Sequence, residues 1–297
     1  MSARMMKRYL LIGITVFLFA QSAVLSQEKP VRPLTFTELW NNVAFYDTNL
    51  EKKRFASLLG RFEGKIGLNV FDYPIQVYGA YYTAASQATE YWDNYLYSGA
   101  GVRIIPFRDF RSSGWYNEWL NGVKIFGESL SASYLKNQAS AEAAGLKDQD
   151  VRYGVEIWHE WNLDDPDFGR PWAELWTNFS TRSTNFSTLE SSSYVIYFQP
   201  KIGWHLGQGI EIYLRGDVTS SDRDDYWLNI ADYGVGLRFE PWRSEGQASD
   251  LFRKFKMFAE VLGVSYLKDK PTDLAPPEPN KEVSSDVRFG VEFSYGR

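Results

Sequence analysis

Beyond residue 33, apolar and polar residues alternate with a period of two in a series of short segments. In one clear run the apolar or small positions are Phe62, Gly64, Ile66, Leu68 and Val70. This alternation is typical of β-strands that have one apolar face and one polar face. The sequence predicts twelve such strands, at 36–47, 61–71, 75–81, 94–106, 121–136, 150–162, 171–182, 191–204, 209–220, 226–240, 254–268 and 285–296.

The connections between these segments also alternate in character. One set, which includes 48–60, 137–149 and 269–284, is polar and rich in Ser, Asn, Asp, Lys and Glu. The other set includes short turns such as Asp72-Tyr73 and Leu206-Gly207-Gln208-Gly209. An even number of strands with long loops at one end and short turns at the other is typical of outer-membrane barrels.

The N-terminal sequence predicts the cellular compartment of the protein. Arg4, Lys7 and Arg8 precede an apolar run at 10–20, and small residues lead to a cleavage site after Ser26. This arrangement is typical of a secretory signal peptide, and the apolar run is shorter than the roughly 20 residues of a spanning helix. We therefore expect a signal peptide at 1–26 and a short periplasmic segment at 27–34, with a non-cleaved anchor as the alternative.

The secreted remainder, 35–297, is predicted to be all-β. Strands that enter a bilayer must pair all their backbone groups, which requires a closed barrel. We expect a transmembrane antiparallel up-and-down β-barrel of about twelve strands in the bacterial outer membrane, reached via the periplasm, with both termini periplasmic. A soluble secreted β-protein is the alternative.

The amino-acid composition agrees with a barrel and argues against disulfides, thiolate metal sites and a nucleic-acid partner. Phe, Trp and Tyr make up 17% of the chain, with 11 Trp, and most of the Trp residues fall near predicted periplasmic strand ends. Aromatic girdles at the two membrane interfaces account for this excess, and outer-membrane lipid is the expected partner. There is no Cys, and the net charge is −5. Disulfides and thiolate metal sites are therefore excluded, and no nucleic-acid partner is expected.

The polar face of nearly every predicted strand carries charge. Cross-strand ion pairs that support a narrow interior are the simplest interpretation. The two signs are balanced, which argues against a strongly ion-selective pore. The basic candidates are Lys65, Arg103, Lys124, Arg152, Lys201, Arg215, Arg238, Lys256 and Arg288. The acidic candidates are Glu63, Glu128, Glu156, Glu160, Glu174, Glu211, Asp217, Asp232, Glu240, Glu260 and Glu292.

Catalysis is not expected. The chain has two histidines, and we expect His159 on the lipid side of its strand and His205 at a turn. Neither has a serine and an orienting carboxylate at a spacing that favours hydrolysis. We predict no enzyme activity, no cofactor and no metal site.

Between 150 and 182, three tryptophans and three carboxylates share one parity and therefore one strand face. If that face is inward, the hairpin around 163–170 brings them together near the periplasmic mouth. Aromatic rings stack on sugar rings and carboxylates bind hydroxyl groups, so a saccharide site is predicted at Trp158, Trp172, Trp176, Glu156, Glu160 and Glu174. Alternatively, these tryptophans fill the narrowing barrel end or belong to the girdle.

The last strand resembles the C-terminal signal that the barrel-assembly machinery recognises. Gly290, Phe293 and Tyr295 carry this resemblance, although Gly296-Arg297 follow where an aromatic residue usually ends the chain. It implies the assembly machinery as a partner. An ordinary amphipathic strand is the alternative.

Two segments resemble a known family. Phe71-Asp-Tyr-Pro-Ile-Gln-Val-Tyr-Gly-Ala-Tyr-Tyr82 and Tyr233-Gly-Val-Gly-Leu-Arg-Phe-Glu-Pro-Trp242 are similar to the C-terminal barrel of phage-adsorption protein A and related exopolysaccharide-secretion porins. Members carry a long helical-repeat region before the barrel, and no such region precedes the first strand in this sequence. The resemblance implies polysaccharide export. We expect a porin-like transport channel for saccharide or exopolysaccharide cargo, with a non-conducting structural, adhesion or phage-receptor-like barrel as the alternative.

Overall fold

The computed structural model describes residues 34–48, 57–70, 73–87, 91–108, 116–143, 149–163, 168–182, 193–222, 228–242, 254–268 and 285–296. The predicted signal peptide at 1–26 lies outside these ranges, as does nearly all of the predicted periplasmic segment 27–34. The same holds for most of the loops 48–60 and 269–284.

The described strands form one closed antiparallel barrel in which each strand pairs with its neighbours in the sequence and β1 pairs with β12. The prediction of a twelve-stranded up-and-down barrel is confirmed. The strands are β1 (Thr35–Thr48), β2 (Ser57–Asn69), β3 (Ile75–Ser86), β4 (Tyr95–Ile104), β5 (Val123–Tyr134), β6 (Gln149–Trp161), β7 (Pro171–Arg182), β8 (Ser193–Gly207), β9 (Ile210–Ser221), β10 (Ile230–Phe239), β11 (Phe255–Tyr266) and β12 (Ser285–Tyr295).

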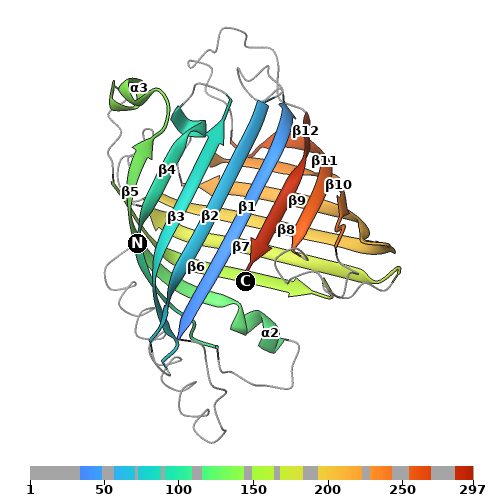
Figure 1. Ribbon diagram of the computed structural model, residues 1–297, viewed down its shortest axis with the longest axis horizontal. Coiled ribbons are helices and arrows are strands. Elements are labelled where there is room, and N and C mark those ends of the chain that lie inside the picture. The colour runs from blue at the N-terminus through green and yellow to red at the C-terminus, as the bar shows by residue number, and fades with distance from the viewer. Residues whose placement is uncertain are drawn as a thin grey trace, which may run out of the picture.

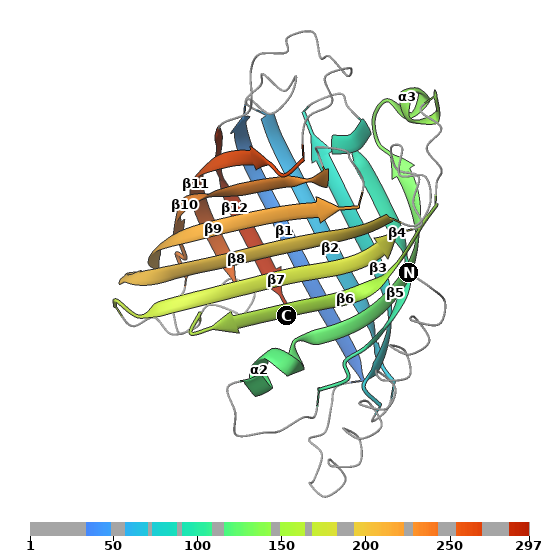
Figure 2. The same ribbon diagram turned by 180° about the vertical axis from the view of Figure 1, so that it is seen from behind.

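Both ends of the described chain lie at the same end of the barrel, because Leu39 near the start of β1 is the partner of Tyr295 at the end of β12. We call this the terminal end and the opposite one the distal end. The strands are strongly tilted, so β1–β3 on one wall cross β7–β9 on the other (Figures 1 and 2). Among the described residues, three short helical segments lie between strands: η1 (Tyr91–Asp93), α2 (Tyr116–Asn121) and α3 (Gln138–Ala143). Within the described ranges, no helix is both long and apolar enough to cross a membrane.

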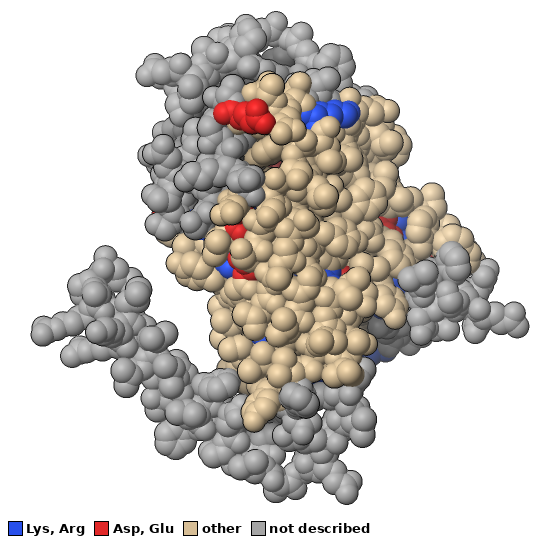
Figure 3. Space-filling model, turned by 60° about the vertical axis from the view of Figure 1, so that its left-hand side comes forward, with Lys and Arg blue, Asp and Glu red and all other residues tan. Residues whose placement is uncertain are grey.

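The period-two pattern separates an apolar outside from a charged inside. Large apolar side chains such as Leu214, Val235, Val261 and Phe289 are each more than half exposed on the outer face. Their strand neighbours of opposite parity point inward and include the charged residues that the alternation assigned to the interior. The described surface in Figure 3 accordingly shows few Lys, Arg, Asp or Glu side chains between the rims.

Several strand boundaries and the position of one histidine differ from the prediction. β2 begins at Ser57 rather than 61, because it pairs with β1 as far as Tyr46. β3 continues to Ser86, where it still pairs with β2. His205 does not lie at a turn: the β8–β9 turn consists of Gln208 and Gly209, which have positive φ, so β8 extends through His205 to Gly207. A two-residue turn of this kind needs fewer residues than the Gly-rich segment suggested.

The barrel consists of two six-stranded copies, β1–β6 and β7–β12, which correspond strand for strand. The correspondence is visible in short identical motifs at equivalent positions. Two three-residue motifs recur: Glu38-Leu39-Trp40 as Glu174-Leu175-Trp176, and Lys65-Ile66-Gly67 as Lys201-Ile202-Gly203. Three longer motifs also recur: Gly99-x-Gly101-x-Arg103 as Gly234-x-Gly236-x-Arg238, Ser133-Tyr-Leu-Lys136 as Ser265-Tyr-Leu-Lys268, and Asp150-Val-Arg-x-Gly-Val-Glu156 as Asp286-Val-Arg-x-Gly-Val-Glu292. The copies occupy opposite halves of the ring, so an approximate two-fold axis runs along the barrel.

The hydrogen bonds repeat as well. At the distal end, the backbone N–H of Ser86 donates to Asn94 Oδ1 at 3.0 Å, and that of Ser221 donates to Asn229 Oδ1 at 3.0 Å. Lys136 Nζ donates to the carbonyl of Ser86, and Lys268 Nζ donates to that of Ser221. The two copies therefore share side-chain contacts and not only strand order.

Two equivalent glycines make room for two equivalent tyrosines. A Cβ at Gly101 would lie 2.6 Å from the ring of Tyr78, and one at Gly236 would lie 2.4 Å from the ring of Tyr213. Real Cβ atoms do not approach so closely, so these glycines let the rings lie flat against the barrel wall. Tyr78 and Tyr213 can then reach the interior charges described below.

Candidate functional site: charge clusters in the barrel interior

The first copy holds a cluster of three cations and three carboxylates in the interior. We call it the first cluster, and it consists of Glu38, Lys65, Arg103, Lys124, Glu128 and Glu156. Arg103 donates to Glu38 through Nη1 and Nη2, at 2.7 and 2.6 Å. Lys65 on β2 lies 3.5 Å from Glu128 and 3.6 Å from Glu156, which are on β5 and β6. These pairs join non-neighbouring strands, so they cross the interior rather than run along the wall.

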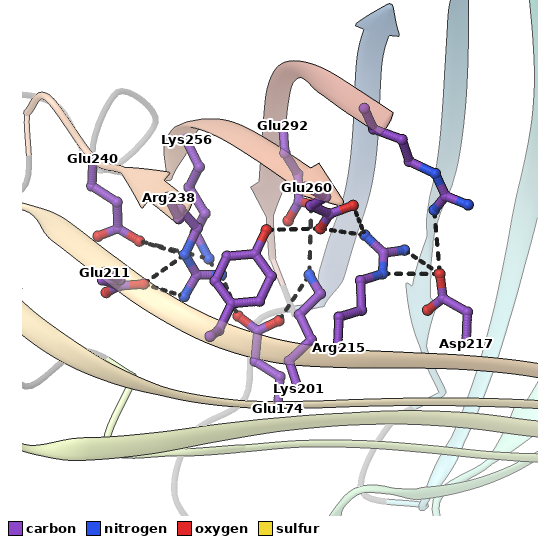
Figure 4. Close-up of polar contacts among 12 residues, drawn as sticks. Glu174, Lys201, Glu211, Arg215, Asp217, Arg238, Glu240, Lys256, Glu260 and Glu292 are labelled. Carbon is purple, nitrogen blue, oxygen red and sulfur yellow. Dashed lines mark hydrogen bonds and ion pairs between the residues drawn. The ribbon is translucent and has the colours of Figure 1, made fainter. Parts of the chain in front are cut away.

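The second copy holds the same six residue types at the equivalent positions, shown in Figure 4. The second cluster consists of Glu174, Lys201, Arg238, Lys256, Glu260 and Glu292. Arg238 Nη1 lies 2.7 Å from Glu174 Oε1, as Arg103 lies against Glu38. Lys201 on β8 lies 3.9 Å from Glu292 on β12, which repeats the Lys65–Glu156 contact. Each cluster is neutral overall, which limits the cost of placing six charges in the interior.

Tyrosine hydroxyls complete both clusters. Tyr78 donates to Glu128 at 2.9 Å, and Tyr213 donates to Glu260 at 2.7 Å. These hydrogen bonds bind the inner carboxylate of each cluster to the adjacent wall. Charge-assisted hydrogen bonds of this kind are stronger than neutral ones, so they hold the cluster geometry firmly.

Each buried guanidinium also stacks on an aromatic ring. Arg103 lies 4.7 Å from the ring centroid of Phe36, and Arg238 lies 4.3 Å from that of Trp172. Phe36 and Trp172 occupy equivalent positions in the two copies. Cation–π contact with a desolvated arginine stabilises the cluster by about 2 kcal/mol or less. Trp172 is only 2% exposed, so its ring is an internal support for Arg238.

The two copies differ behind the arginines. In the first copy, Arg103 Nε donates to Gln76 at 2.5 Å, and Gln76 in turn donates to Asn69 at 2.7 Å. In the second copy the equivalent positions hold Glu211 and His205. Arg238 Nε donates to Glu211 at 2.6 Å, and His205 Nδ1 lies 2.8 Å from the other oxygen of Glu211. A neutral amide pair in one copy is thus an acid–imidazole pair in the other.

Solvent exposure is graded across each cluster. The side chains nearest the wall are almost fully buried, with Arg103 at 1% and Glu128 at 2%. Those that reach toward the barrel axis retain more exposure, with Lys65 at 13% and Glu156 at 14%. Lys201 at 14% and Glu292 at 12% repeat this gradient in the second copy. Lys65, Glu156, Lys201 and Glu292 therefore keep a small solvent-accessible surface inside the barrel.

The sequence-predicted saccharide residues all point into the interior, as their shared parity required. Cα pairing places Trp158 beside Trp176 and Glu160 beside Glu174, and Glu156 beside Asn178. The structure gives these six residues different surroundings. Glu156 belongs to the first cluster, Glu174 belongs to the second, and Trp172 supports Arg238. Trp158, Trp176 and Glu160 remain partly exposed near the terminal end. Saccharide binding by this group stays a prediction.

The C-terminal strand closes the barrel against β1. Its Val287, Phe289 and Tyr295 are exposed on the outer face, and Gly290 faces inward against Ala44. The motif from Asp286 to Glu292 also occurs in β6, where its last residue, Glu156, belongs to the first cluster. Phe293 and Tyr295 have no such equivalents, because β6 carries Ile157 and His159 there. Recognition of Gly290, Phe293 and Tyr295 by the assembly machinery stays a prediction.

His159 lies on the outward side of its strand, as expected. Its ring stacks on Trp119 of α2 at 5.8 Å and meets Trp161 at 4.0 Å between ring centroids. This places an aromatic group at the outer rim of the terminal end. Among the described residues, no group of three or more His, Cys, Asp or Glu side chains is arranged to hold a metal ion.

The alternation identified which charged residues point inward but not which of them meet. Phe36 and Glu38 were missed as functional residues, because the alternation does not show that a ring on a strand face supports a charge or that Glu38 belongs with the interior carboxylates. The signal that could have found them is the internal repeat. Self-comparison pairs Lys65 with Lys201 and Glu156 with Glu292, and it marks the residues that both copies keep.

Known proteins that resemble the chain share little sequence with it. No protein-family model matches the chain, and no curated protein matches it by sequence. Solved structures that resemble it include the β domain of the Bordetella autotransporter BrkA, at 8% identity over 89% of this chain and 100% of that chain, with a TM-score of 0.39. An outer membrane channel from Pseudomonas putida F1 matches at 8% identity over 91% and 100%, with a TM-score of 0.36. The anion-selective porin from Comamonas acidovorans matches at 8% identity over 88% and 98%, with a TM-score of 0.32.

Proposed function

We propose that the protein is an outer-membrane β-barrel that forms a narrow water-filled channel. The membrane part of this proposal rests on the outer face of the barrel. A soluble barrel would not leave Leu214, Val235, Val261 and Phe289 more than half exposed around its circumference. Exposed apolar surface of this extent needs lipid or a partner to cover it, and a closed barrel is a structure whose backbone is satisfied in lipid. A signal peptide at 1–26 and the assembly machinery would deliver the chain there.

The channel part rests on the position of the two clusters. The first cluster connects β2 with β5 and β6 and fills the interior beside β3–β5. The second connects β8 with β12 and fills the interior beside β9–β11. The inward faces of β6–β8 and β12–β2 form the parts of the barrel wall between the two clusters. The solvent exposure of Lys65, Glu156, Lys201 and Glu292 is the observation that supports a passage.

For the cargo, we propose small saccharides or a single polysaccharide chain. Trp158 and Trp176 lie side by side at the terminal end of this passage and retain exposed surface. Aromatic rings beside Glu160 offer a stacking surface and a hydrogen-bond acceptor for sugar hydroxyls. This agrees with the resemblance to exopolysaccharide-secretion porins. We propose no enzymatic role.

Membrane insertion is tested by extraction and by gel mobility. The protein is expected to fractionate with the outer membrane and to require detergent for release. Its electrophoretic mobility should change on boiling, because a closed barrel with every strand paired resists unfolding by dodecyl sulfate at room temperature. Recovery of the folded protein from the soluble periplasmic fraction would contradict the proposal.

Conduction is tested in planar bilayers with the double variant Lys65→Ala, Lys201→Ala. The wild type should conduct with weak ion selectivity, because cations and carboxylates border the passage in equal number. The variant should show a larger conductance and a reversal potential shifted toward cations, because Glu156 and Glu292 then border a wider space. Lys136→Ala is the control, since Lys136 is exposed at the distal end and contacts Ser86.

The second candidate is a non-conducting structural or adhesion barrel. The ion pairs that cross the interior favour it, because they fill much of the cross-section on both sides. The same bilayer recordings distinguish the two candidates. Absence of any open state in both the wild type and the double lysine variant would establish the non-conducting barrel and overturn the channel.

A further inference from the structure

The distal half of the interior contains a second kind of repeated site. At three equivalent positions the first copy has Tyr46, Arg61 and Arg152, and the second has Arg182, Tyr197 and Arg288. The barrel rearranges them into two groups, because β12 pairs with β1 and β6 pairs with β7. One group contains Arg288, Tyr46 and Arg61, on β12, β1 and β2. The other contains Arg152, Arg182 and Tyr197, on β6, β7 and β8.

Each group has two arginines and one tyrosine, although the residues at two of the positions have been exchanged. Tyr46 is equivalent to Arg182, and Arg61 is equivalent to Tyr197. A tyrosine and an arginine have thus changed places between the copies, and the composition of each group is unchanged. Side-chain packing alone does not explain this exchange, because tyrosine and arginine differ in shape and charge. Both groups therefore present the same residue types to the interior.

Two of the four arginines in these groups, Arg61 and Arg182, have no ion-pair partner among the described residues. Arg152 and Arg182 are direct cross-strand partners on the same inward face, an arrangement of like charges that destabilises a sheet. Arg152 is paired with Asp150, and Arg288 is paired with Asp286, with Asp232 at 2.9 Å and with Asp217 at 3.4 Å. No carboxylate of the described residues forms an ion pair with Arg61 or Arg182. Each group therefore has one guanidinium without an ion pair.

These two guanidinium groups can be reached from the interior. Arg61 shares the inward parity of Lys65, yet it is exposed, and Arg182 is partly exposed. The guanidinium of Arg182 lies 5.1 Å from the ring centroid of Tyr197, and that of Arg288 lies 5.4 Å from the ring centroid of Tyr46. Each group thus presents a positive charge and an aromatic ring together on the inward face.

A buried amide lies beside each group. Asn42 is the cross-strand partner of Arg61, and its equivalent Asn178 is the partner of Tyr197. Asn42 is 6% exposed and Asn178 is 8% exposed, and the Oδ1 atom of each has no hydrogen-bond partner. An acceptor that is left unsatisfied at both equivalent positions is suited to a donor supplied by a ligand.

We propose that these two groups, with Asn42 and Asn178, form a pair of binding sites for acidic saccharides whose sugar units carry carboxylates. The guanidinium of Arg61 or Arg182 binds the carboxylate, the tyrosine ring packs against the sugar, and Asn Oδ1 accepts a hydroxyl hydrogen bond. The two-fold relation places the sites on opposite walls of the distal half, so one chain could contact both. This inference deepens the proposed saccharide channel and rests on its water-filled interior.

Calorimetric titration of the detergent-solubilised barrel tests the sites without requiring conduction. Trigalacturonate is the acidic probe, maltotriose the neutral probe and inorganic phosphate the bare anion. The wild type should bind trigalacturonate and bind neither of the other two at comparable concentration. Arg61→Gln and Arg182→Gln should each weaken that binding about tenfold, the loss expected when one charged hydrogen-bonding group is removed.

The exchange between the copies offers a sharper variant. The double variant Tyr46→Arg, Arg61→Tyr converts the first group to the order found in the second, so it should bind trigalacturonate within about twofold of the wild type. Arg170→Gln is the matched control, because Arg170 is exposed at the terminal end, and it should leave the affinity unchanged. Heat-dependent gel mobility verifies that each variant is folded.

The outcomes separate this inference from the channel. Loss of binding in the exchanged double variant, or unchanged binding in both single glutamine variants, would overturn the sites. Equal binding of maltotriose would overturn the role of the arginines, and equal binding of phosphate would reduce the sites to bare-anion sites. If trigalacturonate binds as expected and bilayers show no conductance, the sites stand and the channel is refuted.

Discussion

Replacement of Arg238 by Met is expected to lower the free energy of unfolding by about 3–5 kcal/mol, the usual effect of removing one partner from a buried ion pair. Arg238 is 3% exposed and contacts Glu174 at 2.7 Å and Glu211 at 2.6 Å. Methionine keeps much of the side-chain volume over Trp172 but leaves both carboxylates without their main cation. Urea titration of the protein folded in lipid vesicles, followed by gel mobility, measures the change.

Arg103→Met is the matched control within the same molecule. Arg103 occupies the equivalent position but contacts one carboxylate, Glu38, and the neutral Gln76. Its replacement should therefore cost less than that of Arg238. Adding Glu174→Gln and Glu211→Gln to Arg238→Met should restore part of the loss, because the stranded charges are removed. Exposed ion pairs contribute less than about 1 kcal/mol to the free energy of unfolding. If Arg238→Met and Arg103→Met both lower it by less than that amount, the clusters do not stabilise the barrel.

Leu214→Arg is expected to destabilise the barrel by about 2–4 kcal/mol, or to prevent its insertion, because it places a charge at mid-height on a lipid-facing strand. Leu214 is 54% exposed on β9, with Ile212 beside it on the same face. In water the same substitution at an exposed position would have little effect. The large expected cost is therefore specific to a lipid environment.

Leu135→Arg provides the comparison for this prediction. Leu135 is 52% exposed, as exposed as Leu214, but it follows the distal end of β5, where headgroups would solvate the charge. Its substitution should cost about 0–1 kcal/mol in the same vesicle assay. Equal, small costs for Leu214→Arg and Leu135→Arg would show that the outer face does not contact lipid.

Much of the fold follows from period-two alternation alone, because a strand with one lipid face and one interior face admits a single register for its apolar residues. That is why Lys65, Arg103 and Glu292 could be assigned to the interior. The wrong prediction that His205 lies at a turn has a local cause. Two glycines flank Gln208, and the positive φ of Gln208 and Gly209 shortens the turn to these two residues, so the strand runs further than the glycines suggest.

The interior clusters could not be predicted from alternation, because their contacts join strands that are three or four apart in the ring. Such contacts depend on strand tilt and on the size of facing side chains. The pairing of Lys65 with Glu156 follows once the barrel closes, and the repeat then gives Lys201 with Glu292. The role of Trp172 was hidden for the same reason: only the structure shows that Arg238 covers its ring.

The chain has no cysteine, so an introduced cysteine is its only thiol. Single cysteines can therefore test directly whether the barrel has a lipid-facing outside and a water-filled inside. Lys201→Cys and Val235→Cys would be reconstituted in liposomes and treated with a small water-soluble thiol reagent. Lys201 borders the passage, whereas Val235 is 51% exposed on the outer face. We expect the cysteine at 201 to react and the cysteine at 235 to be protected by lipid. Reaction at 235 with protection at 201 would contradict this expectation.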